Sequence, residues 1–288
     1  MLFRLKERIR EVRLLNSDKN KIRKYLKSGQ KPWSYGYNEY KKGALSDVLN
    51  DQNIYDLFRD NQKLPEKYGF RIDERIVELP WVISKLDTEK CLLLDAGSAL
   101  NFKNILDLNI FNSKKVVIYT LSPEETMVRQ SNVSYVYGDL RDTILKNNCF
   151  DEIVCVSTLE HIGMNNEFLY SNDSKFNECN TDDYKDAIKE FYRLLKPGGR
   201  LFVTVPYGKY ENIGWLQQFD SKMIETMINV FDGSSYVVTY YKYFNDGWQI
   251  IDKAACNDCL YYDVHNSSDY EPDYIAAARA VACVELVK

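Results

Sequence analysis

Short apolar runs alternate with longer amphipathic stretches through the middle of the chain. Five runs have the length and residue types of buried strands: Cys91–Leu94, Lys115–Tyr119, Val133–Tyr137, Glu152–Val156 and Leu201–Val205. Helical stretches lie between them, which predicts an α/β fold, a doubly wound domain with a mainly parallel sheet. Two later runs, Tyr236–Phe244 and Ala280–Val287, have no strong helical pattern between them, and we expect them to pair as an antiparallel ribbon at the sheet edge. The expected sheet has seven strands.

The flanking segments predict the organisation of the rest of the chain. Residues 1–85 are polar and helical in pattern, so we interpret them as a helical N-terminal extension to an α/β domain at 86–288. Pro80, just before the first strand, is expected to kink or end any helix. Residues 207–233 and 245–279 are longer than simple connections require. Insertions of this kind beside a sheet usually serve a site.

The start of the chain carries an uneven charge. Lys and Arg are abundant there, and apolar residues recur at near-helical spacing, namely Leu2, Leu5, Ile9, Val12 and Leu15. This pattern indicates a basic amphipathic helix. Packing on the body, a homodimer contact, and contact with an anionic substrate or a membrane surface all remain open for it.

Composition excludes several classes of protein. The net charge of −4 argues against a general nucleic-acid binder, because phosphate affinity comes from clustered positive charge. No apolar run approaches the roughly 20 residues of a membrane-spanning helix, and no apolar signal region follows Met1, which favours a cytoplasmic protein. The seven cysteines favour reduced thiols. Cys256 and Cys259 form the only close pair, without two further ligands at zinc spacing, so we predict no metal.

Polar and small residues follow the predicted strands in a regular order. The first strand ends in Asp95-Ala96-Gly97-Ser98-Ala99-Leu100-Asn101, and small residues there allow the backbone to approach a ligand closely. The second strand ends at Thr120-Leu121-Ser122, and the third at Gly138-Asp139-Leu140. The fourth continues into Ser157-Thr158-Leu159-Glu160-His161-Ile162. The fifth is preceded by Leu194-Leu195-Lys196-Pro197-Gly198-Gly199.

Together these motifs resemble class I S-adenosylmethionine-dependent methyltransferases over about residues 75–207, with Leu-Lys-Pro-Gly-Gly and Leu-Glu-His-Ile as the most specific pieces. The resemblance implies a Rossmann-like sheet and S-adenosylmethionine as the cofactor. Asp95 and the Gly97 turn would lie against its methionine part, and Asp139 would accept from the adenine amino group. The implied cofactor-binding residues are Asp95, Gly97, Ser98, Ala99, Asn101, Thr120, Leu121, Asp139, Leu140, Ser157 and Thr158. Thr120 departs from the family, which usually places an acid there to hold the ribose.

A narrower resemblance concerns the segments Glu74–Trp81, Leu94–Asn101, Glu160–Asn166 and Ala276–Leu286, which look like bacterial methyltransferases of surface-polysaccharide and nucleotide-sugar pathways. It implies that the acceptor is a sugar hydroxyl, a poor nucleophile that benefits from a general base. His161, just after the fourth strand, is the first candidate base, although a structural role stays open for it. Glu160 would orient the imidazole or cap the following helix, and Asp220 is the second candidate base.

The two insertions supply candidate substrate contacts. Trp215 and Gln218 belong to the first, and His265 lies among tyrosines in the second, where aromatic rings suit stacking on a sugar face. The acceptor is expected to be anionic, as a nucleotide sugar is. Two alternatives remain open: a methyltransferase acting on an amine, carboxylate or other small metabolite, and a non-catalytic binding protein on a degenerate methyltransferase fold.

Overall fold

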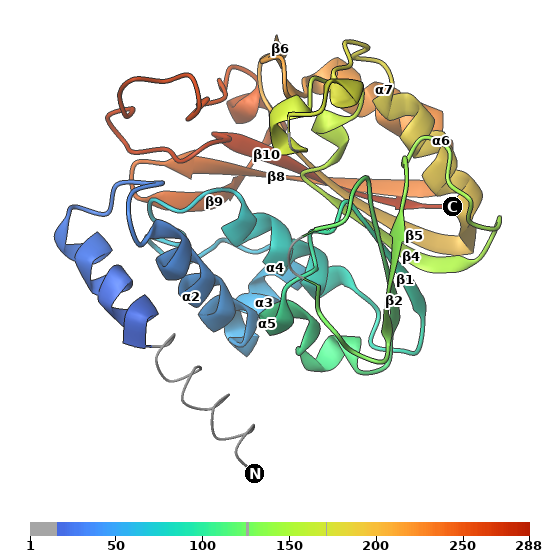
Figure 1. Ribbon diagram of the computed structural model, residues 1–288, viewed down its shortest axis with the longest axis horizontal. Helices are drawn as coiled ribbons and strands as arrows, with labels where there is room; N and C mark the ends of the chain where they lie inside the picture. The colour runs from blue at the N-terminus through green and yellow to red at the C-terminus, as the bar shows by residue number, and fades with distance from the viewer. Residues whose placement is uncertain (1–15, 125–126, 171) are drawn as a thin grey trace.

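The computed structural model describes residues 16–124, 127–170 and 172–288 (Figure 1). The expected basic helix over Leu2–Leu15 lies outside these residues. Residues 16–27 are helical. The larger helices are α2 (Tyr37–Leu49), α3 (Gln52–Arg59), α4 (Arg75–Lys85), α5 (Lys103–Leu106), α6 (Tyr184–Leu194) and α7 (Ser221–Phe231). Short 3-10 turns are η1 (Asn109–Phe111), η2 (Leu159–His161), η3 (Glu167–Leu169), η4 (Ser174–Phe176) and η5 (Lys253–Cys256).

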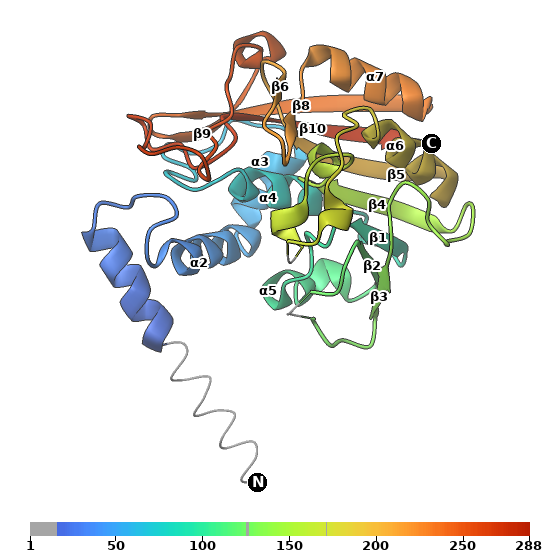
Figure 2. The same ribbon diagram turned by 45° about the horizontal axis from the view of Figure 1, so that its top comes forward.

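One mixed sheet organises the molecule, with the strand order β3-β2-β1-β4-β5-β10-β8-β9 (Figure 2). Its strands are β1 (Leu92–Ala96), β2 (Lys115–Thr120), β3 (Val133–Tyr137), β4 (Phe150–Val156), β5 (Leu195–Pro206), β8 (Ser235–Phe244), β9 (Gly247–Ile251) and β10 (Ala280–Val287). The first five are parallel, and β10 runs antiparallel between β5 and β8. A separate ribbon pairs β6 (Glu211–Asn212) with β7 (Gln217–Gln218).

The expected α/β class and antiparallel end of the sheet are confirmed, but the expected count of seven strands is wrong. The eighth strand is β9, which forms a hairpin with β8 and takes the edge position. Its five residues fall inside the segment 245–279, which the sequence pattern predicts to be an insertion beside the sheet. The edge strand of the sheet is therefore β9, and the pair of β8 and β10 lies inside it.

Helices cover both faces of the sheet, giving three layers (Figure 1). Alternate residues of a strand point to opposite faces, and in β1 Leu93 joins the core under α2, α3 and α4 while Leu94 joins the core under α6 and α7. Both leucines are fully buried. Because both faces are covered, the central strands are apolar throughout rather than alternating.

Helix α4 runs through Pro80 to Lys85, so of the two expected effects of this proline, a kink or an end, the helix end does not occur. A proline at this position removes the N–H that would donate to the carbonyl four residues earlier, that of Ile76. The hydroxyl of Tyr68 donates to that carbonyl instead, at 2.7 Å. The carbonyl keeps a partner, and α4 continues beneath the sheet.

The segment before α4 is bonded to the far end of the sheet. Trp248 in β9 donates its backbone N–H to the carbonyl of Tyr68 at 2.8 Å and its indole N–H to that of Ile72 at 2.9 Å. Further toward the N-terminus, the indole of Trp33 donates to the carbonyl of Ala276 at 2.6 Å. The early helices and the last strands thus form one packed unit.

Candidate active site

Two cavities meet at the carboxyl ends of the parallel strands, where ligands of open α/β sheets bind. The smaller, about 190 Å³, includes Thr120 after β2, Asp139 after β3 and His161 after β4. The larger, about 910 Å³, lies between the turn after β1, α2 and α5, and includes Ser98, Ala99 and Asn101. Gly97 and Ser157 line both cavities. The predicted cofactor residues Leu121, Leu140 and Thr158 also line the smaller one.

The turn after β1 is shaped by a buried carboxylate and a glycine. Asp95 is fully buried and accepts backbone N–H groups from Ala99 at 3.1 Å and Leu100 at 2.8 Å, so it holds the turn rather than lining either cavity. Burial raises the pKa of Asp95 to about 7, against the lowering effect of those two bonds. Gly97 has a φ of 110°, and a Cβ there would lie 2.0 Å from the hydroxyl oxygen of Thr158. Only glycine fits.

Polar atoms without a protein partner line the larger cavity. The hydroxyl of Ser98 and the amide nitrogen of Asn104 are buried and have no hydrogen bond within the described part of the chain. Asn101, by contrast, is committed to the protein: its oxygen accepts from Tyr135 and its amide donates to Glu124. Ser98 and Asn104 therefore retain donors and acceptors that a ligand can use.

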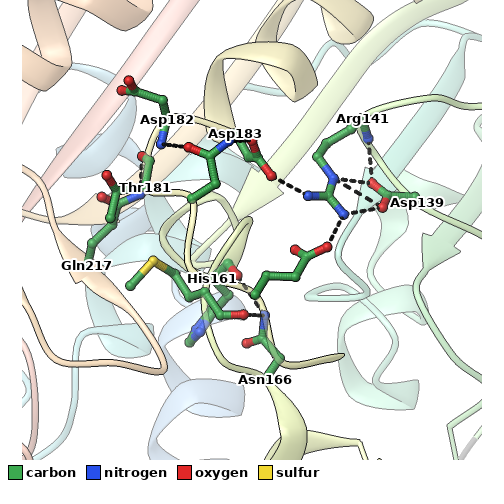
Figure 3. Close-up of polar contacts among 11 residues, drawn as sticks. Asp139, Arg141, His161, Asn166, Thr181, Asp182, Asp183 and Gln217 are labelled. Carbon is green, nitrogen blue, oxygen red and sulfur yellow. Dashed lines mark hydrogen bonds and ion pairs between the residues drawn. The ribbon is translucent and has the colours of Figure 1, made fainter. Parts of the chain in front are cut away.

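Arg141, which sequence reasoning missed, controls the environment of Asp139 (Figure 3). Its guanidinium contacts both oxygens of Asp139, at 2.6 to 3.1 Å, and also pairs with Glu178 and Asp183. Although burial opposes ionisation, the bonds from Arg141 lower the pKa of Asp139. Asp139 is therefore an ionised acceptor at neutral pH, shared between Arg141 and any ligand in the smaller cavity. The sequence signal for this ion pair was the position of Arg141, two residues after Asp139.

The imidazole of His161 has a defined tautomer. Its Nδ1 lies 2.9 Å from the carbonyl oxygen of Trp215, and since a carbonyl only accepts, Nδ1 carries the proton and Nε2 keeps its lone pair. Burial lowers the pKa of His161 to about 4, against the raising effect of the Trp215 carbonyl. The neutral ring thus keeps one unprotonated nitrogen, and His161 belongs to the lining of the smaller cavity. Asn166 fixes this loop by donating to the carbonyl of His161 at 2.7 Å (Figure 3).

Three residues predicted separately, His161, Trp215 and His265, form one aromatic cluster. The ring of Trp215 stacks on His161 with centroids 5.2 Å apart and meets His265 edge-on at 5.3 Å. Phe168, which the sequence did not single out, contacts both Trp215 and His265. The two insertions and the loop after β4 therefore converge beside the candidate base.

A buried group of charged residues lies behind this site. Glu160 and Glu78 are 2% and 0% exposed, and Glu78 accepts from Ser157 at 2.7 Å and from Arg75 at 2.8 Å. Glu160 lies 4.0 Å from His161 Nε2, too far for a hydrogen bond, and its Oε2 has no partner among the described residues. Burial raises the pKa of Glu160 to about 8, with Glu78 and Glu74 adding to the effect. The i, i+3 spacing of Arg75 and Glu78 was the sequence signal for this group.

Two predicted residues lie elsewhere. Asp220 caps α7 by accepting the backbone N–H of Met223 at 2.8 Å, and it lines neither cavity. Gln218 is fully buried and donates to the carbonyls of Lys209 and Cys259. Neither side chain joins the group around His161.

Metal ligands do not gather in the described chain. Over residues 16–124, 127–170 and 172–288 no three His, Cys, Asp or Glu side chains are placed to hold an ion. Cys256 and Cys259 are buried free thiols.

Comparison with known proteins gives the class of the chain. Residues 94–203 match a family model described as a methyltransferase domain. This segment spans the turn after β1, the strand ends around both cavities, and most of β5. The match confirms the enzyme class that the sequence predicts: a methyltransferase with S-adenosylmethionine as its cofactor. No curated protein matches the chain.

Among solved structures, similarity is weak. An N1-methyltransferase acting on 1,6-didemethyltoxoflavin from Burkholderia thailandensis is 12% identical, covering 69% of this chain and 72% of that one, with a TM-score of 0.42. The YcgJ protein of Bacillus subtilis is 12% identical, covering 73% and 97%, with a TM-score of 0.44. The N-methyltransferase NodS of Bradyrhizobium japonicum is 12% identical, covering 86% and 98%, with a TM-score of 0.40. Similarity of this degree does not identify an acceptor.

Within residues 16–124, 127–170 and 172–288, no helix combines the length and the apolar character that a membrane span requires.

Proposed function

We propose that this enzyme transfers the methyl group of S-adenosylmethionine to a sugar hydroxyl on an anionic acceptor, such as a nucleotide-linked sugar or a precursor of a surface polysaccharide. The observation that carries the proposal is the neutral imidazole of His161, anchored through Nδ1 at the wall of the cavity beside the strand ends. A hydroxyl is a poor nucleophile that benefits from such a base, whereas an amine in its neutral form is already nucleophilic.

The cofactor would occupy the cavities that meet at Gly97 and Ser157. Asp139 would accept from the adenine amino group, and Ser98 and Asn104 would meet the polar methionine end. Bound there, the cofactor would supply its methyl group for an in-line displacement, in which the acceptor oxygen would bond to the methyl carbon as the bond from carbon to sulfur breaks. Holding the three atoms in line supplies several kcal/mol of the barrier.

His161 Nε2 would take the hydroxyl proton as the new bond from carbon to oxygen forms. Its lowered pKa keeps the nitrogen unprotonated at neutral pH, but also makes it a weak base. His161 would therefore take the proton while the hydroxyl oxygen bonds to the methyl carbon, so that no free alkoxide would form. Glu160, which the sequence predicts to orient the imidazole or cap the following helix, makes no hydrogen bond to His161 Nε2 at 4.0 Å, and it would act only by staying neutral beside the ring.

Aromatic and cationic side chains support the acceptor class. Trp215 and His265 present rings beside His161, which suits the apolar face of a sugar. At the larger cavity, Lys42 and Arg129 are exposed cations with no ion pair within the described residues. They would meet an anionic group of the acceptor.

The first test is calorimetric titration of the full chain with S-adenosylhomocysteine, repeated with Asp139→Ala. Micromolar binding that weakens in the variant is expected. Absence of binding to the unaltered protein would contradict the proposal and favour a non-catalytic binding protein.

The second test concerns the base. His161→Gln is expected to lower kcat for a panel of nucleotide sugars by about 10²–10⁴-fold with unchanged cofactor affinity. Asp220→Asn, which can still cap α7, is the matched comparison. Loss of rate in Asp220→Asn instead would make Asp220 the base, and full activity of His161→Gln would favour an amine acceptor.

A further inference from the structure

Arg75, the first residue of α4, places a cation in the wall of the larger cavity. Its guanidinium makes one side-chain hydrogen bond, from Nη1 to Glu78 at 2.8 Å, so Nε and Nη2 have no partner in the part of the chain that the structure describes. The side chain remains 32% exposed although the neighbouring Glu78 is fully buried. Arg75 therefore presents a partly free donor pair to the cavity.

Glu78 fixes the position of this guanidinium. One carboxylate oxygen accepts from Arg75, and the other accepts from the hydroxyl of Ser157 at 2.7 Å. Ser157 has a φ of 39° at the end of β4 and lines both cavities. Two hydrogen bonds, from Ser157 to Glu78 and from Arg75 to Glu78, thus connect the junction of the cavities to the cation.

Arginine in this setting is suited to a planar anion. A carboxylate or phosphate can take two parallel N–H groups from one guanidinium, an arrangement stronger and more directional than a contact with lysine. The cavity also contains Ser98, whose buried hydroxyl has no partner within the described residues. A bound anion would satisfy both groups.

We propose that Arg75, positioned by Glu78, is an anion-binding residue of the active site and fixes its ligand by two hydrogen bonds to one carboxylate or phosphate group. The inference rests on the proposed function, because the cavity is assigned there to cofactor and acceptor. Two sources can supply the anion: the amino-acid carboxylate of the cofactor, or an acidic group of the acceptor. Their chemistry at Arg75 is the same.

The experiment uses three probes on the full chain: S-adenosylhomocysteine, 5′-methylthioadenosine, which lacks the amino-acid end, and inorganic phosphate. Removing Arg75 alone would leave Glu78 buried without its partner, so the main variant is the double substitution Arg75→Met with Glu78→Gln. A second variant, Arg75→Lys, keeps the positive charge but lacks the two parallel N–H groups of the guanidinium. Arg59→Met, on the outer side of α3, is the matched control, because Arg59 is 48% exposed and pairs with Asp60 outside both cavities. Thermal unfolding checks that each variant folds.

A loss of about 10–100-fold in affinity for S-adenosylhomocysteine with unchanged affinity for 5′-methylthioadenosine would assign the anion to the cofactor. Unchanged affinity for both, with loss of the stabilisation that phosphate gives to the cofactor-loaded protein, would assign it to the acceptor. Either result supports the proposal, and Arg75→Lys should show most of the same loss. A folded double variant that binds all three probes as the unaltered protein does would overturn it.

If the proposed function is wrong, the same three probes give a different result. In that case the unaltered protein binds neither adenosine compound, while any phosphate binding still depends on Arg75.

Discussion

Replacing Glu160 by glutamine should stabilise the folded protein at neutral pH, although the residue is buried beside the candidate base. Glu160 is 2% exposed, and burial raises its pKa from 4.5 to about 8. An acid whose pKa is higher in the folded state favours folding fully below pH 4.5, and that contribution is lost as the pH rises through 8. Each pH unit in this window lowers the free energy of unfolding by about 1.4 kcal/mol. At pH 7 the accumulated loss is therefore about 3 kcal/mol.

Glutamine has nearly the same shape and does not ionise, so it should recover about 1–3 kcal/mol at pH 7 and almost nothing at pH 5. The measurement is urea unfolding of both proteins at pH 5, 6, 7 and 8, with the difference plotted against pH. The difference should grow steadily over this range. A difference that does not change with pH would show that Glu160 is not protonated in the folded state, and the reasoning would fail.

Glu152→Gln is the matched control, because Glu152 is equally buried but fully bonded. It is 2% exposed and accepts from Lys114 at 2.8 Å and Arg200 at 2.7 Å. Removing its charge leaves a buried lysine unpaired, which should cost about 3–5 kcal/mol. The two substitutions are the same chemical change, and they should shift stability in opposite directions at pH 7.

Two further predictions concern the turn after β1 and the candidate base. Gly97→Ala forces a Cβ against Thr158 at a φ of 110°, so it should lower the free energy of unfolding by about 1–3 kcal/mol and weaken S-adenosylhomocysteine binding in calorimetry, whereas Gly43→Ala, in open space on α2, should stabilise by about 0.5–1 kcal/mol. Equal effects of the two would contradict the close approach at Gly97. With the pKa of His161 lowered to about 4, Nε2 stays unprotonated down to that pH, so kcat/KM should hold through pH 6.5 and fall only near pH 4. An acid limb at pH 6.5 that disappears in His161→Gln would refute this environment.

Most of the sheet could be predicted because buried parallel strands are continuous apolar runs. Val133–Tyr137 and Ala280–Val287 were placed with their observed bounds. Strand β9 was missed because it is short and begins with glycine, although Asp246-Gly247 between apolar runs is a strong hairpin signal. Helix α4 passes through Pro80 because the hydroxyl of Tyr68, eight residues before Ile76 and outside the helix, donates to the carbonyl that lacks its N–H partner. The residues of the helix itself do not predict that hydrogen bond.

The residues of the candidate site were also predictable only in part. Residues that follow strands, such as Gly97, Asp139 and Ser157, were predictable because parallel strands end at one edge of the sheet. The cluster of Trp215 with His265 was not, because two insertions far apart in sequence must fold before the rings meet. The roles of the named residues, and the division at residue 85, remain predictions.

The bonds between the segment before α4 and strand β9 also set an order of events during synthesis. Ile72 and Trp248 are separated by 176 residues, which a ribosome needs roughly 10–35 s to add. Until Trp248 emerges, the carbonyl of Ile72 lacks its partner and the apolar side of α4 has no completed sheet to cover. We therefore expect the segment before α4 to become stable only late in synthesis, and to be exposed to chaperones and proteases until then.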